Sequence, residues 1–220
     1  MSHVPQIRSI LNELFPDPPI PLKHSNRYTL LIAILLSAQC TDKKVNEVTP
    51  KLFAKAKTPE QMAKLSIAQI ESIIRPCGLA PTKAKAIKKL SEILVEEYQG
   101  KTPCTIEALE KLPGVGHKTA SVFAVQALKI PAFPIDTHIH RCAKRWRLSS
   151  GKNVKQTERD LMKIFPKSLW GKLHLQIIYY ARKHCPAKRH KLEQCPICKA
   201  IHECKRLKDP KRDGNSPVSF

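Results

Sequence analysis

Glycine, acidic residues and long apolar stretches are all scarce in this sequence. The longest uninterrupted apolar run, Leu30 to Leu36, is far shorter than the roughly 20 residues that a helix needs to cross a bilayer. We therefore expect no membrane-spanning segment. With only 7 glycines in 220 residues, two glycines placed one residue apart are an informative feature.

The N-terminal residues lack the order of a signal peptide, which needs a basic start, an apolar stretch and a small-residue cleavage site. From Met1 to Phe15 the apolar residues recur at helical spacing instead, which predicts a packed amphipathic helix; they are Val4, Ile7, Leu11 and Leu14. We expect a cytoplasmic, nucleoid-associated protein, in a compartment where disulfides are rare.

Strand patterns are missing as well. No stretch alternates apolar and polar residues for long enough to predict a strand, and no internal repeat stands out. Helical spacing predicts an all-α fold, with helices over residues 30–38, 43–55, 58–64, 66–75, 81–98, 105–111, 117–128, 136–147, 155–165 and 169–183. Thr58 and Ser66 are expected N-caps. The segment 205–220 is expected to be a disordered basic tail.

Basic residues are abundant. The chain has 39 Lys and Arg against 18 Asp and Glu, which gives a formal net charge of +21. Such an excess goes beyond what solubility needs and indicates a polyanionic partner. DNA or RNA fits this charge better than a membrane surface does.

The paired glycines, Gly114 and Gly116, lie in the segment LPGVGHKTA from Leu112 to Ala120, between two expected helices. Such a turn lets the backbone approach a partner closely, and the amide N–H groups that open the next helix point outward at its positive end. The motif alone leaves two interpretations open, a binding site for a backbone phosphate and a plain turn without a ligand. The net charge favours the phosphate site.

Lys118 is expected in the first turn of the second helix, and Asp136 follows downstream in the segment IDTH. A lysine amine is a nucleophile only when neutral, and a helix N-terminus and partial burial both disfavour its charged form. Lysines in such places can form Schiff bases. A nearby carboxylate can take a proton or stabilise positive charge on a sugar. The alternatives are a phosphate-binding lysine and an aspartate that serves only as a helix N-cap.

The eight cysteines fall into two groups. Four are scattered singly and are expected to be small buried residues without a function: Cys40, Cys77, Cys104 and Cys142. The other four lie within twenty residues and predict a metal site: Cys185, Cys195, Cys198 and Cys204. Ligand type alone leaves zinc and an iron–sulfur cluster open, although the uneven spacing suits the cluster better. Bound metal would present the basic loop that follows Cys185 to phosphates.

Together these features resemble the endonuclease III family of DNA glycosylases, with its helix-hairpin-helix motif and iron–sulfur cluster. The resemblance covers about Leu30 to Cys204 and rests on the segments 35–42 (LLSAQCTD), 112–120, 135–139 and 151–154 and on the clustered cysteines. It implies two helical domains with a cleft between them. One is 22–132, with the helix-hairpin-helix, and the other joins 1–21 to 133–204 and carries a [4Fe–4S] cluster on the four clustered cysteines.

The resemblance implies a monomeric, bifunctional glycosylase and abasic-site lyase that excises oxidised pyrimidines from duplex DNA. By this resemblance Lys118 attacks the sugar carbon that bears the damaged base, and the resulting Schiff base allows β-elimination on the 3′ side. Asp136 assists electrostatically or by proton transfer. The related adenine glycosylases generally lack a lysine at this position.

The family also implies which residues contact DNA. Gln39 and Leu79 match positions that insert into the duplex when the damaged nucleotide leaves the stack, a step that costs a few kcal/mol. The remaining expected contacts come from the hairpin and from the basic loop: Leu112, Gly114, Gly116, Lys188, Arg189 and Lys191.

The sequence departs from the family pattern at three places. Nine residues separate Cys185 from Cys195, a longer gap than the family typically has. Because an insertion in a loop is cheap, the cluster is still expected to form, with the basic loop placed differently on DNA. Ala80 stands where many relatives carry an aromatic residue, and His117 replaces a commoner Arg or Lys. These changes affect the inserted wedge and a phosphate contact rather than the proposed chemistry.

Two other functions stay open on the sequence. The first is a monofunctional glycosylase in which Lys118 only binds phosphate, and it predicts no covalent complex that borohydride can trap. The second is a non-catalytic helix-hairpin-helix module with a structural zinc site, and it predicts a colourless protein that binds DNA without cutting it.

Overall fold

The computed structural model describes residues 3–208, with side chains over residues 3–202. All regular elements in this part of the chain are helices, as the sequence predicts, and none of them is both long and apolar enough to cross a membrane. The chain divides into two compact units. We call residues Pro19–Pro134 the continuous unit, and Met1–Pro18 together with Ile135–Phe220 the split unit.

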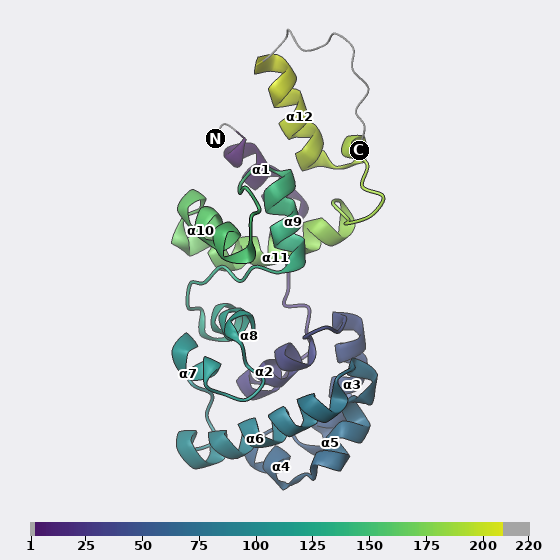
Figure 1. Ribbon diagram of the computed structural model, residues 1–220, viewed down its shortest axis with the longest axis vertical. Helices are drawn as coiled ribbons and strands as arrows, with labels where there is room; N and C mark the ends of the chain where they lie inside the picture. The colour runs from purple at the N-terminus through teal and green to yellow at the C-terminus, as the bar shows by residue number, and fades with distance from the viewer. Residues whose placement is uncertain (1–2, 209–220) are drawn as a thin grey trace. The chain divides into compact units, whose positions relative to one another are not determined.

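The continuous unit is built around one buried helix (Figure 1). Its elements are α2 (Arg27–Leu36), α3 (Asp42–Lys55), α4 (Pro59–Lys64), α5 (Ile67–Ile74), η1 (Arg75–Cys77), α6 (Ala80–Tyr98), α7 (Ile106–Glu110), α8 (His117–Phe123) and η2 (Ala124–Leu128). Every residue of α2 after Arg27 is buried. Helices α3 and α8 pack against α2, and α4 and α5 pack against α6. The hairpin between α7 and α8 is therefore fixed to the core of this unit.

Side-chain caps explain why short helices form here. The Asn26 side chain accepts a hydrogen bond from the Thr29 N–H at 2.8 Å, and Thr29 Oγ1 accepts one from the Asn26 N–H at 3.0 Å. The expected N-caps Thr58 and Ser66 are confirmed, since each accepts a hydrogen bond from the backbone N–H three residues later. Such caps are worth about 1 kcal/mol each. They offset part of the high cost of starting a short helix.

The split unit joins the N-terminal helix to the C-terminal third of the chain. Its elements are α1 (Val4–Leu14), α9 (Thr137–Arg145), α10 (Val154–Ile164), η3 (Lys167–Leu169), α11 (Trp170–Lys183), η4 (Leu192–Gln194) and α12 (Pro196–Lys208). Helix α11 packs against α1 and α9. Gln176 on α11 donates a hydrogen bond to the Phe15 carbonyl at 2.9 Å. The rings of Trp146 and Tyr180 meet edge to face at 5.4 Å.

Two helices differ from the sequence prediction. The helix expected over 117–128 is α-helical only to Phe123 and ends in the π-helical turn η2. Helix α12 was not predicted: Pro196 starts it and Ile197 and Ile201 are buried, but the same segment carries the cysteines whose spacing indicates a metal-binding loop. Residues 205–208, expected in the tail, belong to α12. The rest of the expected tail, 209–220, lies outside the described residues.

Candidate active site and metal centre

The two hairpin glycines are required for different reasons. Gly114 has a φ of 76°, and a Cβ there would lie 2.9 Å from the Ala86 Cβ and 3.0 Å from Leu35 Cδ1. Backbone conformation and packing therefore both demand glycine. Gly116 is the N-cap of α8 with a φ of −88°, and a Cβ there would meet no atom of the described residues within 4 Å. Glycine at this second position keeps the outer surface of the turn open.

The residues that flank the turn hold it in place. The Leu112 side chain is only 3% exposed, so it anchors the hairpin in the core and leaves its backbone as the part that can meet DNA. His117 Nδ1 lies 2.6 Å from Glu110 Oε1, which joins the start of α8 to the end of α7. The histidine that replaces the commoner basic residue therefore pairs within the hairpin.

Lys118 and Asp136 both lie at the start of a helix. Lys118 is in the first turn of α8, and its side chain is exposed. Asp136 is half-buried, and its Oδ1 accepts a hydrogen bond from the Ile139 N–H at 2.7 Å. The expected N-cap role of Asp136 on α9 is thus confirmed. Lys118 belongs to the continuous unit and Asp136 to the split unit.

Two loops of the continuous unit present the residues expected to enter DNA. Gln39 follows α2 with a φ of 54°, and Leu79 precedes α6 with a φ of 51°. Few residues other than glycine adopt this left-handed region, and bulky ones rarely do. Both side chains are exposed, that of Leu79 by 54%. An exposed leucine held in a strained backbone contributes little to packing, which points to a functional role.

A buried lysine that the sequence analysis missed holds both loops. Lys83 on α6 is 5% exposed, and its Nζ donates hydrogen bonds to the carbonyls of Leu36 at 2.9 Å, Ala38 at 2.8 Å and Cys77 at 3.0 Å. Burial lowers the pKa of Lys83. The ammonium group joins the end of α2 to the segment just before Leu79. Its partners are backbone carbonyls, which leave no signal in a sequence.

The single cysteines differ in their surroundings. Cys77 and Cys142 are buried as expected and Cys40 is half-buried, but the prediction is wrong for Cys104, which is exposed in the loop before α7. Burial and the neighbouring Cys40 thiol raise the pKa of Cys77 to about 11. The Cys142 thiol hydrogen-bonds that of Cys185, so it borders the clustered cysteines.

Three of the clustered cysteines converge with a histidine that the sequence analysis did not single out. The ligand atoms of Cys185, His190, Cys195 and Cys198 all lie within 4.8 Å of one another. The three cysteines are buried, and Nε2 of His190 is buried and has no hydrogen-bond partner within the part of the chain that the structure describes. Thiols and an imidazole are donors that suit zinc or an iron–sulfur centre, so this group could hold a metal. The expected ligand Cys204 has its side chain outside the described residues.

The groups around Cys185 favour its thiolate form. Hydrogen bonds from neighbouring thiols, that of Cys142 first, and from Arg145 hold the pKa of Cys185 well below its usual range. Arg145 Nη1 lies 3.3 Å from Cys185 Sγ, and the Tyr180 hydroxyl lies 3.3 Å from Cys195 Sγ. The thiolate is the form of cysteine that binds metals, and these contacts favour it at Cys185. The same hydrogen bonds to Cys185 raise the pKa of Cys195 and Cys198, so a single negative charge is shared among the converging thiols.

Two arginines of α9 hold the loop that begins at Cys185. Arg141 Nη2 donates a hydrogen bond to the Cys185 carbonyl at 3.0 Å, and Arg145 Nη1 donates one to the Pro186 carbonyl at 2.6 Å. Because Asp136 caps the same helix, α9 connects the candidate catalytic carboxylate to the metal-binding loop.

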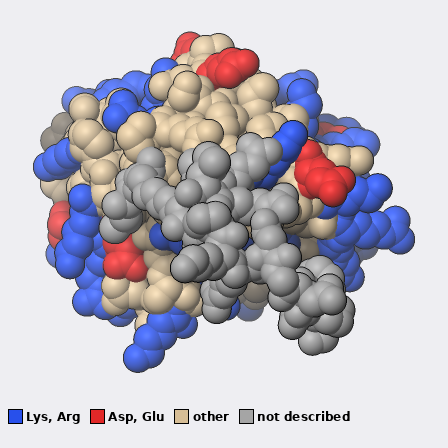
Figure 2. Space-filling model, turned by 90° about the horizontal axis from the view of Figure 1, so that it is seen from above, with Lys and Arg blue, Asp and Glu red and all other residues tan. Residues whose placement is uncertain are grey.

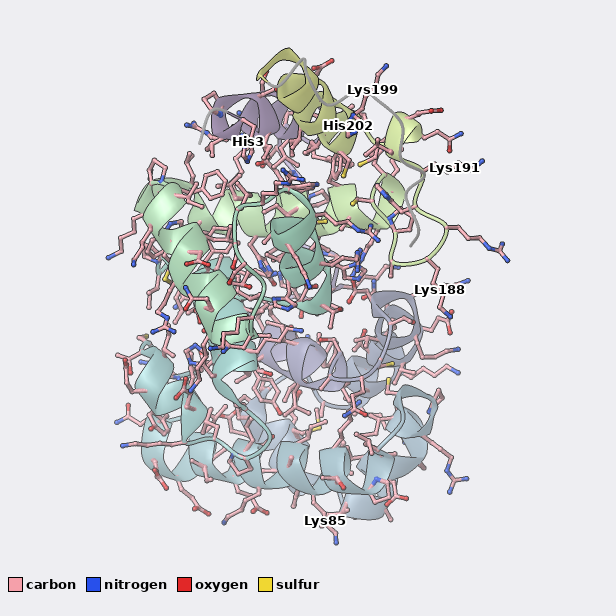
Figure 3. The ribbon with its side chains drawn as sticks, turned by 45° about the horizontal axis from the view of Figure 1, so that its top comes forward. His3, Lys85, Lys188, Lys191, Lys199 and His202 are labelled. Atoms are coloured by element: carbon pink, nitrogen blue, oxygen red, sulfur yellow. The ribbon has the colours of Figure 1, made fainter. Side chains whose placement is uncertain are left out.

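The basic residues of this loop are exposed. They are Lys188, Arg189 and Lys191. Figure 3 shows the labelled side chains of Lys188 and Lys191 extending away from the loop. In Figure 2 Lys and Arg side chains spread around the margin of the face in view, and acidic side chains form only separate patches. The loop can therefore meet a polyanion.

Comparisons with known proteins agree with one another. Residues 32–167 match the HhH-GPD superfamily base excision DNA repair protein model. The chain is 44% identical to endonuclease III of Treponema pallidum over 180 residues, 82% of this chain and 85% of that protein. It is similar to the structure of a non-covalent endonuclease III–DNA complex, with 40% identity, a TM-score of 0.84 and coverage of 92% of this chain and 97% of that one. It is also similar to a trapped endonuclease III–DNA covalent intermediate, with 39% identity, a TM-score of 0.83 and coverage of 91% and 98%.

Proposed function

Because the chain belongs to the HhH-GPD superfamily of base excision DNA repair proteins, we propose that it is a bifunctional DNA glycosylase and abasic-site lyase. Its substrates are oxidised pyrimidines in duplex DNA, and it works as a monomer on nucleoid DNA in the cytoplasm. One observation carries the lyase step. Lys118 stands in the first turn after the glycine hairpin, in a chain 39% identical to a protein that was trapped as a covalent DNA intermediate.

The proposed reaction begins when the neutral Nζ of Lys118 attacks C1′ of the damaged nucleotide. The bond from C1′ to the base breaks, and its electron pair leaves with the base. The nitrogen loses a proton and the sugar ring opens, which gives a Schiff base. The Schiff base makes the C2′ protons acidic, and removal of one expels the 3′ phosphate by β-elimination. Water then hydrolyses the Schiff base and frees the lysine.

Asp136 assists this attack in the proposed mechanism. Its carboxylate accepts the lysine proton or stabilises the positive charge that develops on the sugar. The Ile139 N–H holds Oδ1 of Asp136 and thereby fixes the orientation of the carboxylate. The cap and the catalytic role are compatible because a carboxylate has two oxygens that can accept hydrogen bonds.

Gln39 and Leu79 are proposed to fill the space that the damaged nucleotide leaves. Their exposure and their left-handed backbone support this assignment. Leucine supplies apolar surface that can stack against neighbouring bases, and glutamine supplies a donor and an acceptor for the base that has lost its partner. The cost of extruding the nucleotide is then partly offset.

The hairpin and the basic loop are proposed to bind the DNA backbone. The open surface at Gly116 lets the backbone amides at the start of α8 approach a phosphate. Lys188, Arg189 and Lys191 add exposed positive charge in the split unit. Phosphate contacts fix where a protein sits on a duplex without reading its sequence.

The converging thiols are proposed to hold a [4Fe–4S] cluster, as the family resemblance implies. Cys185, Cys195 and Cys198 would be three of its ligands, and their buried, converging thiols support this. When bound, the cluster would cross-link the loop 185–195 to the start of α12. The family pattern supplies Cys204 as the fourth ligand.

The test is a cleavage assay on duplex DNA that carries one thymine glycol, with the wild type and the Lys118→Gln variant. The wild type is expected to release the base and cut the strand, and Lys118→Gln is expected to bind the same duplex while losing both reactions. Base release without strand cleavage by the wild type would identify a monofunctional glycosylase. Cleavage that survives in Lys118→Gln would remove this lysine from the mechanism.

A further inference from the structure

Two of the singly placed cysteines meet beside the loops that carry Gln39 and Leu79. The thiols of Cys40 and Cys77 are hydrogen-bonded to each other. Cys40 follows Gln39 directly, and Cys77 lies two residues before Leu79. The turn η1, which ends at Cys77, packs against α3, which begins two residues after Cys40. A pair of thiols therefore connects the two loops.

The backbone holds the two thiols in this arrangement. Lys83 Nζ donates hydrogen bonds to the carbonyl of Ala38 at 2.8 Å and to that of Cys77 at 3.0 Å. One ammonium group thus fixes both the chain just before Cys40 and the chain at Cys77. A disulfide forms without backbone movement only between cysteines whose main chains are already close. Two thiols in contact on fixed main chains meet this requirement.

The surroundings give the two thiols different roles. Cys40 is half-buried and Cys77 is buried, so a small oxidant in solution meets Cys40 first. The Lys83 ammonium interacts electrostatically with both thiols, and positive charge favours a thiolate, the reactive form of cysteine. Burial and the neighbouring Cys40 raise the pKa of Cys77, which therefore stays a thiol at neutral pH. An accessible cysteine beside a second, resolving cysteine is the arrangement of redox-sensing thiols.

We propose that Cys40 and Cys77 form an oxidation site for peroxide, and that the resulting disulfide displaces the loops of Gln39 and Leu79 and weakens binding to damaged DNA. The Cys40 sulfur attacks hydrogen peroxide and the O–O bond breaks. This gives a sulfenic acid, and the thiol proton leaves with the departing oxygen as water. The Cys77 sulfur then attacks the Cys40 sulfur, the S–O bond breaks, and hydroxide leaves with the Cys77 proton as a second water. Two thiols are oxidised and one peroxide is reduced.

The new bond changes the positions of both loops. A covalent bond draws two sulfur atoms closer together than a hydrogen bond does. Cys40 is bonded directly to Gln39, and only Gly78 separates Cys77 from Leu79. Gln39 and Leu79 already have a left-handed backbone, so a pull on their neighbours shifts both exposed side chains. The effect on DNA rests on the proposed function of these two residues. In a reducing compartment such a disulfide is transient, as redox-sensing disulfides are.

The first experiment maps the disulfide in the full-length protein. After treatment with hydrogen peroxide, free thiols are blocked and the digested peptides are identified by mass spectrometry. The wild type is expected to contain a disulfide between Cys40 and Cys77. Cys77→Ala is expected to stop at the sulfenic acid on Cys40, which dimedone captures. Cys104→Ala is the matched control, because Cys104 is an exposed thiol of the same unit outside the pair, and it should form the disulfide as the wild type does.

The second experiment measures affinity for a duplex with an abasic-site analogue before peroxide, after peroxide and after dithiothreitol. Oxidation should lower the affinity of the wild type by about fivefold or more, the range of coupling between two sites. Dithiothreitol should restore it. Cys40→Ala keeps every other thiol, so peroxide should leave its affinity unchanged unless damage elsewhere is responsible.

Three results would overturn the proposal. They are the absence of the Cys40–Cys77 disulfide in oxidised wild type, its presence with unchanged affinity, and an equal loss of affinity in Cys40→Ala. Full affinity in untreated Leu79→Ala would instead contradict the DNA-inserting role proposed above. The mapping of the disulfide needs no DNA and would still test the oxidation of the pair.

Discussion

A single ammonium group connects the two loops that carry Gln39 and Leu79. Lys83 bonds three backbone carbonyls, two at the end of α2 and one just before Gly78. A buried charge is tolerated only when its hydrogen bonds are made, and here the carbonyls supply them. At the scale of the residue, Lys83 therefore fixes the positions of the two loops that carry Gln39 and Leu79.

Replacing this lysine should weaken both stability and DNA recognition. Lys83→Met keeps the length of the side chain but leaves the carbonyls without their donor, so the free energy of unfolding is expected to fall by about 1–3 kcal/mol. Binding to duplex DNA with an abasic-site analogue should weaken as well. Lys85→Met is the matched control, because Lys85 lies on the same helix with an exposed side chain (Figure 3). Denaturant unfolding and fluorescence anisotropy measure the two effects.

A double-mutant cycle distinguishes positioning from general stability. If Lys83 acts through the loop of Leu79, then Lys83→Met should cost little further binding energy in a Leu79→Ala background. The two substitutions would then be coupled by about 0.5 kcal/mol or more. Additive losses in binding energy would show that Lys83 does not act through the loop of Leu79, and an unchanged affinity in Lys83→Met would show that it contributes only to the stability of the fold.

At the scale of the element, the two hairpin glycines differ: Gly114 is required by packing, and Gly116 lies at the proposed contact with DNA. Gly114→Ala would force a side chain into the left-handed region and against Ala86, so the free energy of unfolding should fall by more than about 1 kcal/mol. Gly116→Ala meets open space and should cost less than that, while its methyl group obstructs the approach of a phosphate. Gly114→Ala should therefore lower the thermal stability more than Gly116→Ala does, whereas Gly116→Ala should lower the affinity for DNA more. Equal affinity for DNA in the wild type and Gly116→Ala would exclude a phosphate contact at this turn.

Much of the helical framework could be predicted from the sequence because its signals are local. Thr58, Ser66 and Asp136 cap the helices they were expected to cap. Helix α12 was missed because its few buried residues alternate with the cysteines that suggested a metal loop. The π turn after Phe123 has no comparable sequence signal.

The candidate site could be predicted only at residues whose side-chain type and spacing in the sequence indicate their chemistry. Lys118 and the converging thiols have such a signal. Lys83 has none, because its acceptors are carbonyls of residues distant in the sequence. The position of His190 beside the thiols was also not predicted. In the sequence it is one residue of a basic loop, and only the fold brings its ring close to Cys185, Cys195 and Cys198.

At the scale of the whole molecule, the net charge of +21 should make DNA binding strongly dependent on salt. The logarithm of the affinity should fall with the logarithm of the salt concentration by about 0.9 for each phosphate neutralised. The double variant Lys188→Ala and Lys191→Ala should make this slope shallower by roughly 1.8. Binding isotherms for undamaged duplex at several salt concentrations measure it. An unchanged slope would remove both lysines from the DNA interface.

The central claim is that Lys118 forms the covalent bond to DNA, and mapping that bond tests it most directly. The protein is incubated with a thymine glycol duplex and borohydride, the reduced adduct is digested, and the modified peptide is identified by mass spectrometry. The account predicts that the sugar remnant is attached to Lys118 and that Lys118→Gln yields no adduct. An adduct on another lysine or on the N-terminal amine, or no adduct while the strand is cut, would contradict it.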